Sequence, residues 1–139
     1  MKMSKQRKTG TPAMGEEGTK ELLGDLCYLA MRASDSVGAW IHQRVEDQWR
    51  CRAKAGDASC DPDPDSANEA LRKGEVVRYS GENQDGRGMY FTVVPGAKMG
   101  GVLTVVHKDD QDIDGEDLDS LQRIAGLACA QLTTPADLG

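Results

Sequence analysis

The spacing of apolar residues changes twice along this chain, and that change restricts the folds that it can adopt. Near both ends, apolar residues recur every three or four positions, which is the repeat of an amphipathic helix. Between them the repeat falls to two, which is typical of strands with one buried face. A chain of 139 residues has room for a single core. We therefore expect an α/β (α+β) domain in which terminal helices pack on one sheet.

The two terminal helices are the best-defined elements of the sequence. The first is predicted from Thr19 to Ala33, with Thr19 as N-cap and Glu21 in the first turn. The last follows Asp114, which stands three residues before Asp117 as in a capping arrangement. The apolar stripes consist of Leu22, Leu23, Leu26, Cys27, Ala30 and Ala33 in the first helix and Leu118, Leu121, Ile124, Ala125, Ala128 and Leu132 in the last.

Five strands and one short helix are predicted between the terminal helices. The order is two strands paired as a hairpin, a short helix over 67–73, and three strands, of which the last two form a second hairpin. The predicted strands are 37–43, 48–55, 75–79, 89–95 and 101–107. In the first hairpin, strict alternation would place Trp40 and His42 on one face with Arg50 and Arg52, and Ile41 on the other with Trp49 and Cys51.

Charge and composition argue against several classes of function. A net charge of −6 does not suit general nucleic-acid binding, which needs a basic surface. No apolar run approaches the roughly 20 residues that cross a bilayer. The basic start, Met1–Lys8, is not followed by the apolar segment of a secretory signal. We therefore expect a cytoplasmic domain over 19–133, with flexible tails at 1–18 and 134–139.

The cysteines indicate neither a metal site nor a disulfide framework. None is followed by a second cysteine at the Cys-x-x-Cys spacing of zinc and redox motifs. In the cytoplasm we expect reduced thiols, three of them structural and Cys60 exposed in a polar loop. The four residues are Cys27, Cys51, Cys60 and Cys129.

An acidic segment before the last helix begins like an EF-hand calcium loop. Asp110, Asp112 and Asp114 alternate and precede Gly115, but the twelfth position is Leu121, where the loop needs a bidentate Glu. Carboxylates that favour a helix N-terminus explain the same residues. We therefore predict no metal site and no cofactor.

The final third of the chain resembles the GAF domain family. Val93-Val-Pro95 followed by Met99-Gly-Gly-Val-Leu-Thr-Val105 resembles the family's strand that ends in Pro and its next strand that begins with Gly-Val-Leu. Asp112-Ile-Asp-Gly-Glu-Asp-Leu118, continued by Leu121, Ile124 and Ala125, is similar to the start of the family's last helix, with Ile113 in place of an aromatic residue.

Two earlier stretches extend this likeness to roughly residues 19–132. Ser36-Val-Gly-Ala-Trp-Ile41 resembles the first strand of the family, and Ala70-Leu-Arg-Lys-Gly-Glu-Val-Val77 resembles the joint between a helix and the third strand. The resemblance implies an antiparallel five-stranded sheet in the order 2-1-5-4-3. It also implies that the N- and C-terminal helices pack together on one face, and that dimers often form through them.

The chain departs from ligand-binding GAF domains where their pockets are built. In those domains, helices between strands two and three and between strands three and four roof a pocket. Here the two segments, 56–74 and 80–88, are short, and only the first holds a brief helix. The Asn-Lys-Phe-Asp-Glu residues of cyclic-nucleotide-binding members and the cysteine–histidine pair that anchors bilins are also missing. The resemblance therefore implies the fold and no particular ligand.

Two surfaces are candidates for binding. The first is the polar sheet face opposite the helices, where arginines beside aromatic residues suit a small anion, although antiparallel sheets often leave one face solvated. Its residues are Trp40, His42, Arg50, Arg52, Arg78, Tyr90, Thr92 and Thr104. The second is the outer side of the terminal helices, where apolar residues off the main stripes suit a second copy. Its residues are Leu29, Met31, Leu127 and Ala130.

We predict a non-catalytic regulatory module of signal transduction, bacterial in style, that dimerises through its terminal helices and binds a partner protein. One alternative is a sensor of a small anion or nucleotide that uses Arg50, Arg52 and Tyr90. Another is a thiol reductase, because free methionine sulfoxide reductases are a GAF-like group with cysteines around the pocket. Only Cys60 is expected near the pocket mouth, without the second thiol that this chemistry needs, so we predict no enzyme.

Overall fold

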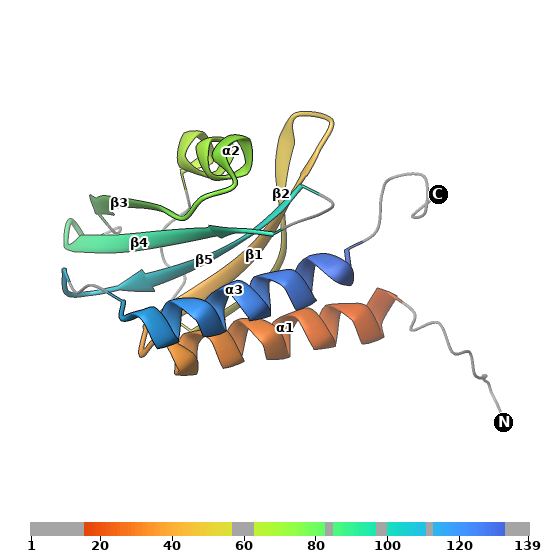
Figure 1. Ribbon diagram of the computed structural model, residues 1–139, viewed down its shortest axis with the longest axis horizontal. Helices are drawn as coiled ribbons and strands as arrows, with labels where there is room; N and C mark the ends of the chain where they lie inside the picture. Colours follow the sequence, from red (N-terminus) through yellow and green to blue (C-terminus); the bar gives the residue numbers. More distant parts are fainter. Residues whose placement is uncertain (1–15, 57–62, 83–84, 97–99, 111–112, 133–139) are drawn as a thin grey trace, which may run out of the picture.

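The computed structural model describes residues 16–56, 63–82, 85–96, 100–110 and 113–132 (Figure 1). They form one five-stranded antiparallel sheet with the order β2-β1-β5-β4-β3. Helices α1 (Glu16–Ala33) and α3 (Gly115–Ala130) cover one face, and the short α2 (Pro64–Lys73) lies on the other. The strands are β1 (Gly38–Val45), β2 (Gln48–Gly56), β3 (Val77–Glu82), β4 (Gly88–Pro95) and β5 (Gly101–His107).

The predicted fold class, order of elements and sheet topology are confirmed. The first helix begins at Glu16 instead of Thr19, and the short helix begins at Pro64 instead of Ala67. α2 starts early because the Asp63 carboxylate accepts hydrogen bonds from the backbone N–H groups of Asp65 and Ser66, and because proline suits a first turn. In the described part of the chain, no helix is long and apolar enough to span a membrane.

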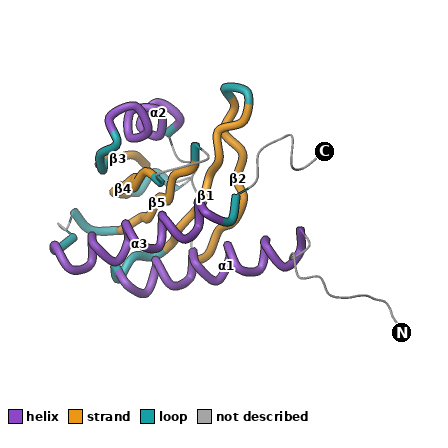
Figure 2. The backbone as a smooth tube through the Cα atoms, turned by 45° about the vertical axis from the view of Figure 1, so that its right-hand side comes forward, coloured by secondary structure: helices purple, strands orange, loops and turns teal. Residues whose placement is uncertain are grey.

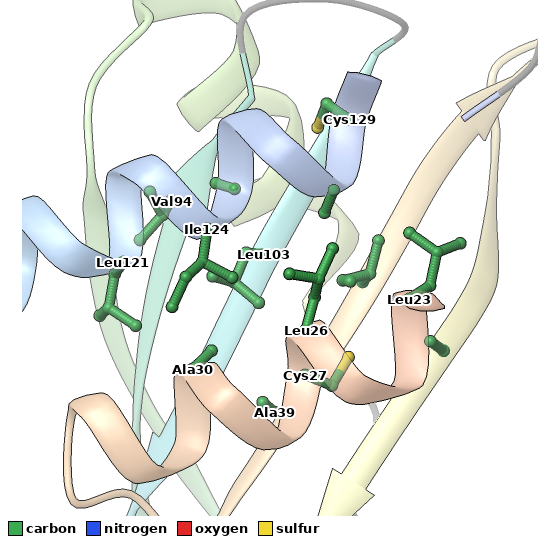
Figure 3. Packing of buried hydrophobic residues seen from close by; sticks show 14 of the residues in the cluster. Leu23, Leu26, Cys27, Ala30, Ala39, Val94, Leu103, Leu121, Ile124 and Cys129 are labelled. Atoms are coloured by element: carbon green, nitrogen blue, oxygen red, sulfur yellow. The ribbon is translucent and has the colours of Figure 1, made fainter. Parts of the chain in front are cut away.

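The main core lies between the sheet and the two long helices. Leu26 and Ala30 from α1 meet Leu121 and Ile124 from α3 above Leu103 of β5, as Figure 3 shows. Asp114 is the N-cap of α3, and its carboxylate accepts a hydrogen bond of 2.8 Å from the N–H of Asp117, so the predicted cap is confirmed. These contacts fix α1 and α3 firmly to the sheet.

The first hairpin turns later than predicted. β1 continues to Val45, and the turn consists of Glu46 and Asp47, which have φ angles of 52° and 65°. Two successive residues with positive φ are typical of a two-residue type I′ turn, whose twist matches that of the strands. The pairing next to the turn is therefore Arg44 opposite Trp49.

A β-bulge in this hairpin contradicts the predicted alternation. His42 pairs with Cys51 and Ile41 pairs with Ala53, which leaves Arg52 as an extra residue in β2. Because side chains alternate with a period of two, one extra residue exchanges the faces of all residues on one side of it. Trp49 and Cys51 therefore share the face of His42, and the prediction that they face the helices is wrong.

Candidate functional site

Aromatic rings occupy part of the sheet face on which α2 lies. Phe91 stacks between Tyr79 and Trp40, with centroid distances of 4.6 Å and 6.2 Å. Trp40 and Phe91 are buried together with Met89 and Val106. Protein side chains thus fill space on the face where ligand-binding members of the GAF family keep their pocket.

A cleft of about 310 Å³ remains on this face, between α2 and the β1–β2 hairpin. The volume lies near the lower limit of small-molecule pockets, which range from about 300 to 1,000 Å³. The bulge in β2 contributes to this cleft, because it turns Trp49 and Cys51 to the α2 side. The lining residues are His42, Trp49, Cys51, Asp63, Pro64, Ala67 and Val102.

α2 forms one wall of the cleft and is tied to the hairpin through Asn68. The side-chain oxygen Oδ1 of Asn68 accepts hydrogen bonds from Nη1 of Arg44 (3.1 Å) and Nε1 of Trp49 (3.0 Å). The Arg44 guanidinium also lies 6.0 Å from the centre of the Trp49 ring, within cation–π range. We call these three residues the Asn68 clasp.

The eight residues predicted to share a polar face lie on both faces of the sheet, so that prediction is wrong. Trp40 and Thr104 pair with each other and, like His42, lie on the α2 side. Of the eight, His42 alone lines the cleft. The remaining five lie on the face that α1 and α3 cover: Arg50, Arg52, Arg78, Tyr90 and Thr92.

Two causes explain this distribution. The bulge turns the arginines of β2 toward the helical side, where Nη1 of Arg52 donates to Oε1 of buried Gln43 at 2.6 Å. In β4, apolar side chains occur at both odd and even positions, so the sequence pattern does not show on which face of the sheet Tyr90 and Thr92 lie. The arginines are also separated. Arg50 and Arg52 lie in β2, whereas Arg78 lies in β3 at the other edge of the sheet, where it forms an ion pair of 3.9 Å with Asp110. They do not form one anion site.

Of the three cysteines that the structure describes, two are buried and one lines the cleft. Burial raises the pKa of Cys27 to about 12 and that of Cys129 to about 11, so both stay protonated at neutral pH. Cys51 is exposed, which corrects the prediction of a structural thiol, and Cys60 lies outside the described residues. Among the described residues, no second cysteine lines the cleft, and no three His, Cys, Asp or Glu side chains are grouped as metal ligands.

The outer side of the helical layer carries three large exposed apolar side chains. Tyr28 and Leu29 on α1 are 53% and 51% exposed, and Leu127 on α3 is 57% exposed. The two helices run side by side (Figure 2), and Ala130 is also exposed. Met31 was predicted on this surface, but it is half-buried and packs against the core, because its side chain reaches Gly56 of β2.

The sequence did not single out three residues that shape these surfaces: Tyr28, Trp49 and Asn68. For Trp49, the deciding feature is the bulge at Arg52, which interrupts the alternation of β2 and which no local pattern in the sequence marks. Tyr28 is a large apolar ring off the main stripe of its helix. Asn68 is an exposed polar residue in a short helix, and nothing in the sequence distinguishes it from its neighbours.

Solved structures with the same fold include GAF domains and a reductase. A GAF domain region from Geobacter sulfurreducens has a TM-score of 0.66 and 16% identity, and the match covers 83% of this chain and 93% of that one. A type II free methionine-R-sulfoxide reductase from Thermoplasma acidophilum has a TM-score of 0.66 and 13% identity over 84% and 93%. The GAF domain of a two-component sensor histidine kinase from Bacillus halodurans has a TM-score of 0.60 and 14% identity over 86% and 94%.

No protein-family model and no curated protein matches the sequence. The similarity to these solved structures and the strand order nevertheless show that the chain has a GAF-domain fold, as the resemblance in the sequence implied. Because sensor domains and an enzyme share this fold, the fold alone leaves the role of the chain open.

Proposed function

We propose that this chain is a non-catalytic regulatory module that acts by association, pairing with a second copy through the outer side of α1 and α3 and binding a partner protein. The observation that carries this proposal is the exposure of Tyr28, Leu29 and Leu127. Fully burying an exposed leucine contributes about 1.5–3 kcal/mol, and roughly half of that remains to be gained for a side chain that is already half-buried. Single exposed apolar residues are common, but three on two adjacent helices suit an interface.

Small residues beside the large ones support a helical partner. Gly126 lies exposed in the middle of α3, and a methyl group there would meet nothing within 4 Å. A glycine within a helix costs about 1 kcal/mol relative to alanine, and the fold gives no packing reason for it. Close approach of another helix over Gly126 and Ala130 supplies such a reason. Two copies paired in this way form a four-helix bundle.

The charges around this surface suit a second copy better than a partner of one sign. Exposed residues of both signs surround the apolar side chains on each helix, so that a self-complementary arrangement can pair them. They are Lys20, Glu21, Asp25 and Arg32 on α1 and Asp119 and Arg123 on α3.

A matched pair of variants tests the proposal. Leu127→Glu places a charge in the interface and is expected to give a folded monomer in light scattering after size-exclusion chromatography, with an unchanged circular dichroism spectrum. Gln48→Glu adds the same charge at an exposed position of the β1–β2 hairpin, outside α1 and α3, and is expected to leave the dimer intact. A dimer that persists in Leu127→Glu contradicts this interface.

One observation favours a small-molecule sensor as a second candidate function, namely the cleft of about 310 Å³. Arg50 and Arg52 lie on the face that α1 and α3 cover and do not line this cleft, so they give no reason to expect an anionic ligand there. Native mass spectrometry of protein purified from its own host would detect a sensor's ligand as extra mass lost on denaturation. Unmodified mass in both states argues for association alone.

The reductase hypothesis is supported by one neighbour of the same fold, the Thermoplasma acidophilum enzyme. That chemistry needs two cooperating thiols. Cys51 is the one thiol of the described residues that lines the cleft, so a reductase would have to pair it with Cys60. If methionine sulfoxide is reduced by the wild type and not by Cys60→Ser, the non-catalytic proposal is wrong.

A further inference from the structure

α2 buries smaller apolar side chains against the sheet than the two long helices do. Its buried residues are Ala67 and Ala70, which pack on Val93 and Val102, with Leu71 half-buried beside them. α1 and α3 instead bury several leucine and isoleucine side chains. Because hydrophobic stabilisation grows with the apolar area removed from water, two buried alanines and a half-buried leucine hold α2 less strongly than the leucines and isoleucine hold α1 and α3.

Polar contacts supply much of the remaining attachment. In the Asn68 clasp, one oxygen of α2 accepts two hydrogen bonds from the β1–β2 hairpin. At the start of α2, the backbone N–H of Asp63 donates to the Tyr79 hydroxyl at 2.7 Å. At its end, Gly74 adopts the left-handed conformation with φ of 66°, and a Cβ atom there would meet nothing within 4 Å. An element held in this way can open at lower free energy than the whole domain unfolds.

We propose that α2 is a movable wall of the cleft and that Asn68 is its latch. When Arg44 and Trp49 release Asn68, the segment from Asp63 to Gly74 lifts from the sheet as a unit and widens the cleft. Pairing through α1 and α3 uses the opposite face of the sheet (Figure 1), so this inference does not depend on the proposed function. A result that contradicts the pairing of two copies would therefore not contradict the movement of α2, and the reverse also holds.

Hydrogen exchange of the full chain, followed by mass spectrometry, tests the latch with two variants at one position. Asn68→Ala removes the acceptor, so the amides of α2 should exchange on the order of tenfold faster, as the loss of two hydrogen bonds predicts. Asn68→Asp keeps an acceptor oxygen for both donors and adds a charge that favours Arg44, so exchange in α2 should stay at or below the wild-type rate. Amides of α3 should exchange at wild-type rates in both variants.

Trp49 provides a second readout, because its ring loses the Asn68 contact when α2 lifts. Acrylamide should quench fluorescence more strongly in Asn68→Ala than in the wild type or Asn68→Asp, while buried Trp40 stays protected. Three outcomes would overturn the inference. They are unchanged exchange of α2 in Asn68→Ala, equal acceleration in α2 and α3, and Asn68→Asp behaving like Asn68→Ala.

Discussion

The Sγ atom of Cys129 in α3 packs directly on Gly101 at the start of β5. A Cβ atom at Gly101 would lie 2.6 Å from this sulfur and 2.7 Å from Cδ1 of Leu132. Gly96, whose N–H donates to the Gly101 carbonyl at 2.9 Å, meets the same cysteine. The β4–β5 hairpin and the end of α3 thus approach each other more closely than any larger residue at Gly101 permits.

Gly101→Ala should therefore destabilise the domain. The added methyl group overpacks a site without free space, which costs about 1–3 kcal/mol in the free energy of unfolding. Urea unfolding followed by circular dichroism measures this change. Gly115→Ala is the matched control, since a Cβ there meets nothing within 4 Å, and it should be neutral or slightly stabilising. Equal stability of Gly101→Ala and wild type would show that Cys129 and Leu132 do not pack closely against Gly101.

Stability should fall above pH 9 because of the two buried thiols. In the unfolded chain a thiol loses its proton near its ordinary pKa of 9.0, whereas burial raises the pKa of Cys27 to about 12 and that of Cys129 to about 11. Between these values the unfolded state binds fewer protons, so the free energy of unfolding falls by up to about 1.4 kcal/mol per pH unit for each thiol. Urea unfolding at increasing pH should show a shallower decline for Cys27→Ala than for the wild type. A decline of the same slope in both would contradict this origin.

Thiol labelling should separate Cys51 from the other described cysteines. In a Cys60→Ser variant at neutral pH, a maleimide should label Cys51 in the folded protein, because it is exposed while Cys27 and Cys129 are buried. Peptide mapping after labelling in urea should show all three modified. Rapid labelling of Cys27 or Cys129 without urea would mean that the helical layer opens far below the free energy of global unfolding.

The terminal helices and the order of strands were predictable because their apolar repeats are long and unambiguous. Leu121, Ile124 and Ala128 lie on one stripe, and the structure buries all three. Gly101–His107 was predicted with its observed bounds, since glycine precedes an apolar run that lies buried at the centre of the sheet.

The candidate site was much less predictable, because single residues decide it. The extra residue Arg52 in β2 exchanges the faces of Trp49 and Cys51, and no local pattern marks the bulge. In β4 both faces are buried, with Val93 toward α2 and Val94 toward α1 and α3, so alternation carries no information about facing. The pairing of the strands in the sheet, which the sequence pattern does not show, determines the face on which these residues lie.

Sedimentation velocity of the wild-type protein over a wide range of concentrations tests the proposed association most directly. The exposed Tyr28, Leu29 and Leu127 predict a species of twice the 15.0 kDa chain mass that dissociates on dilution. A single species of the chain mass at every concentration would contradict pairing through α1 and α3.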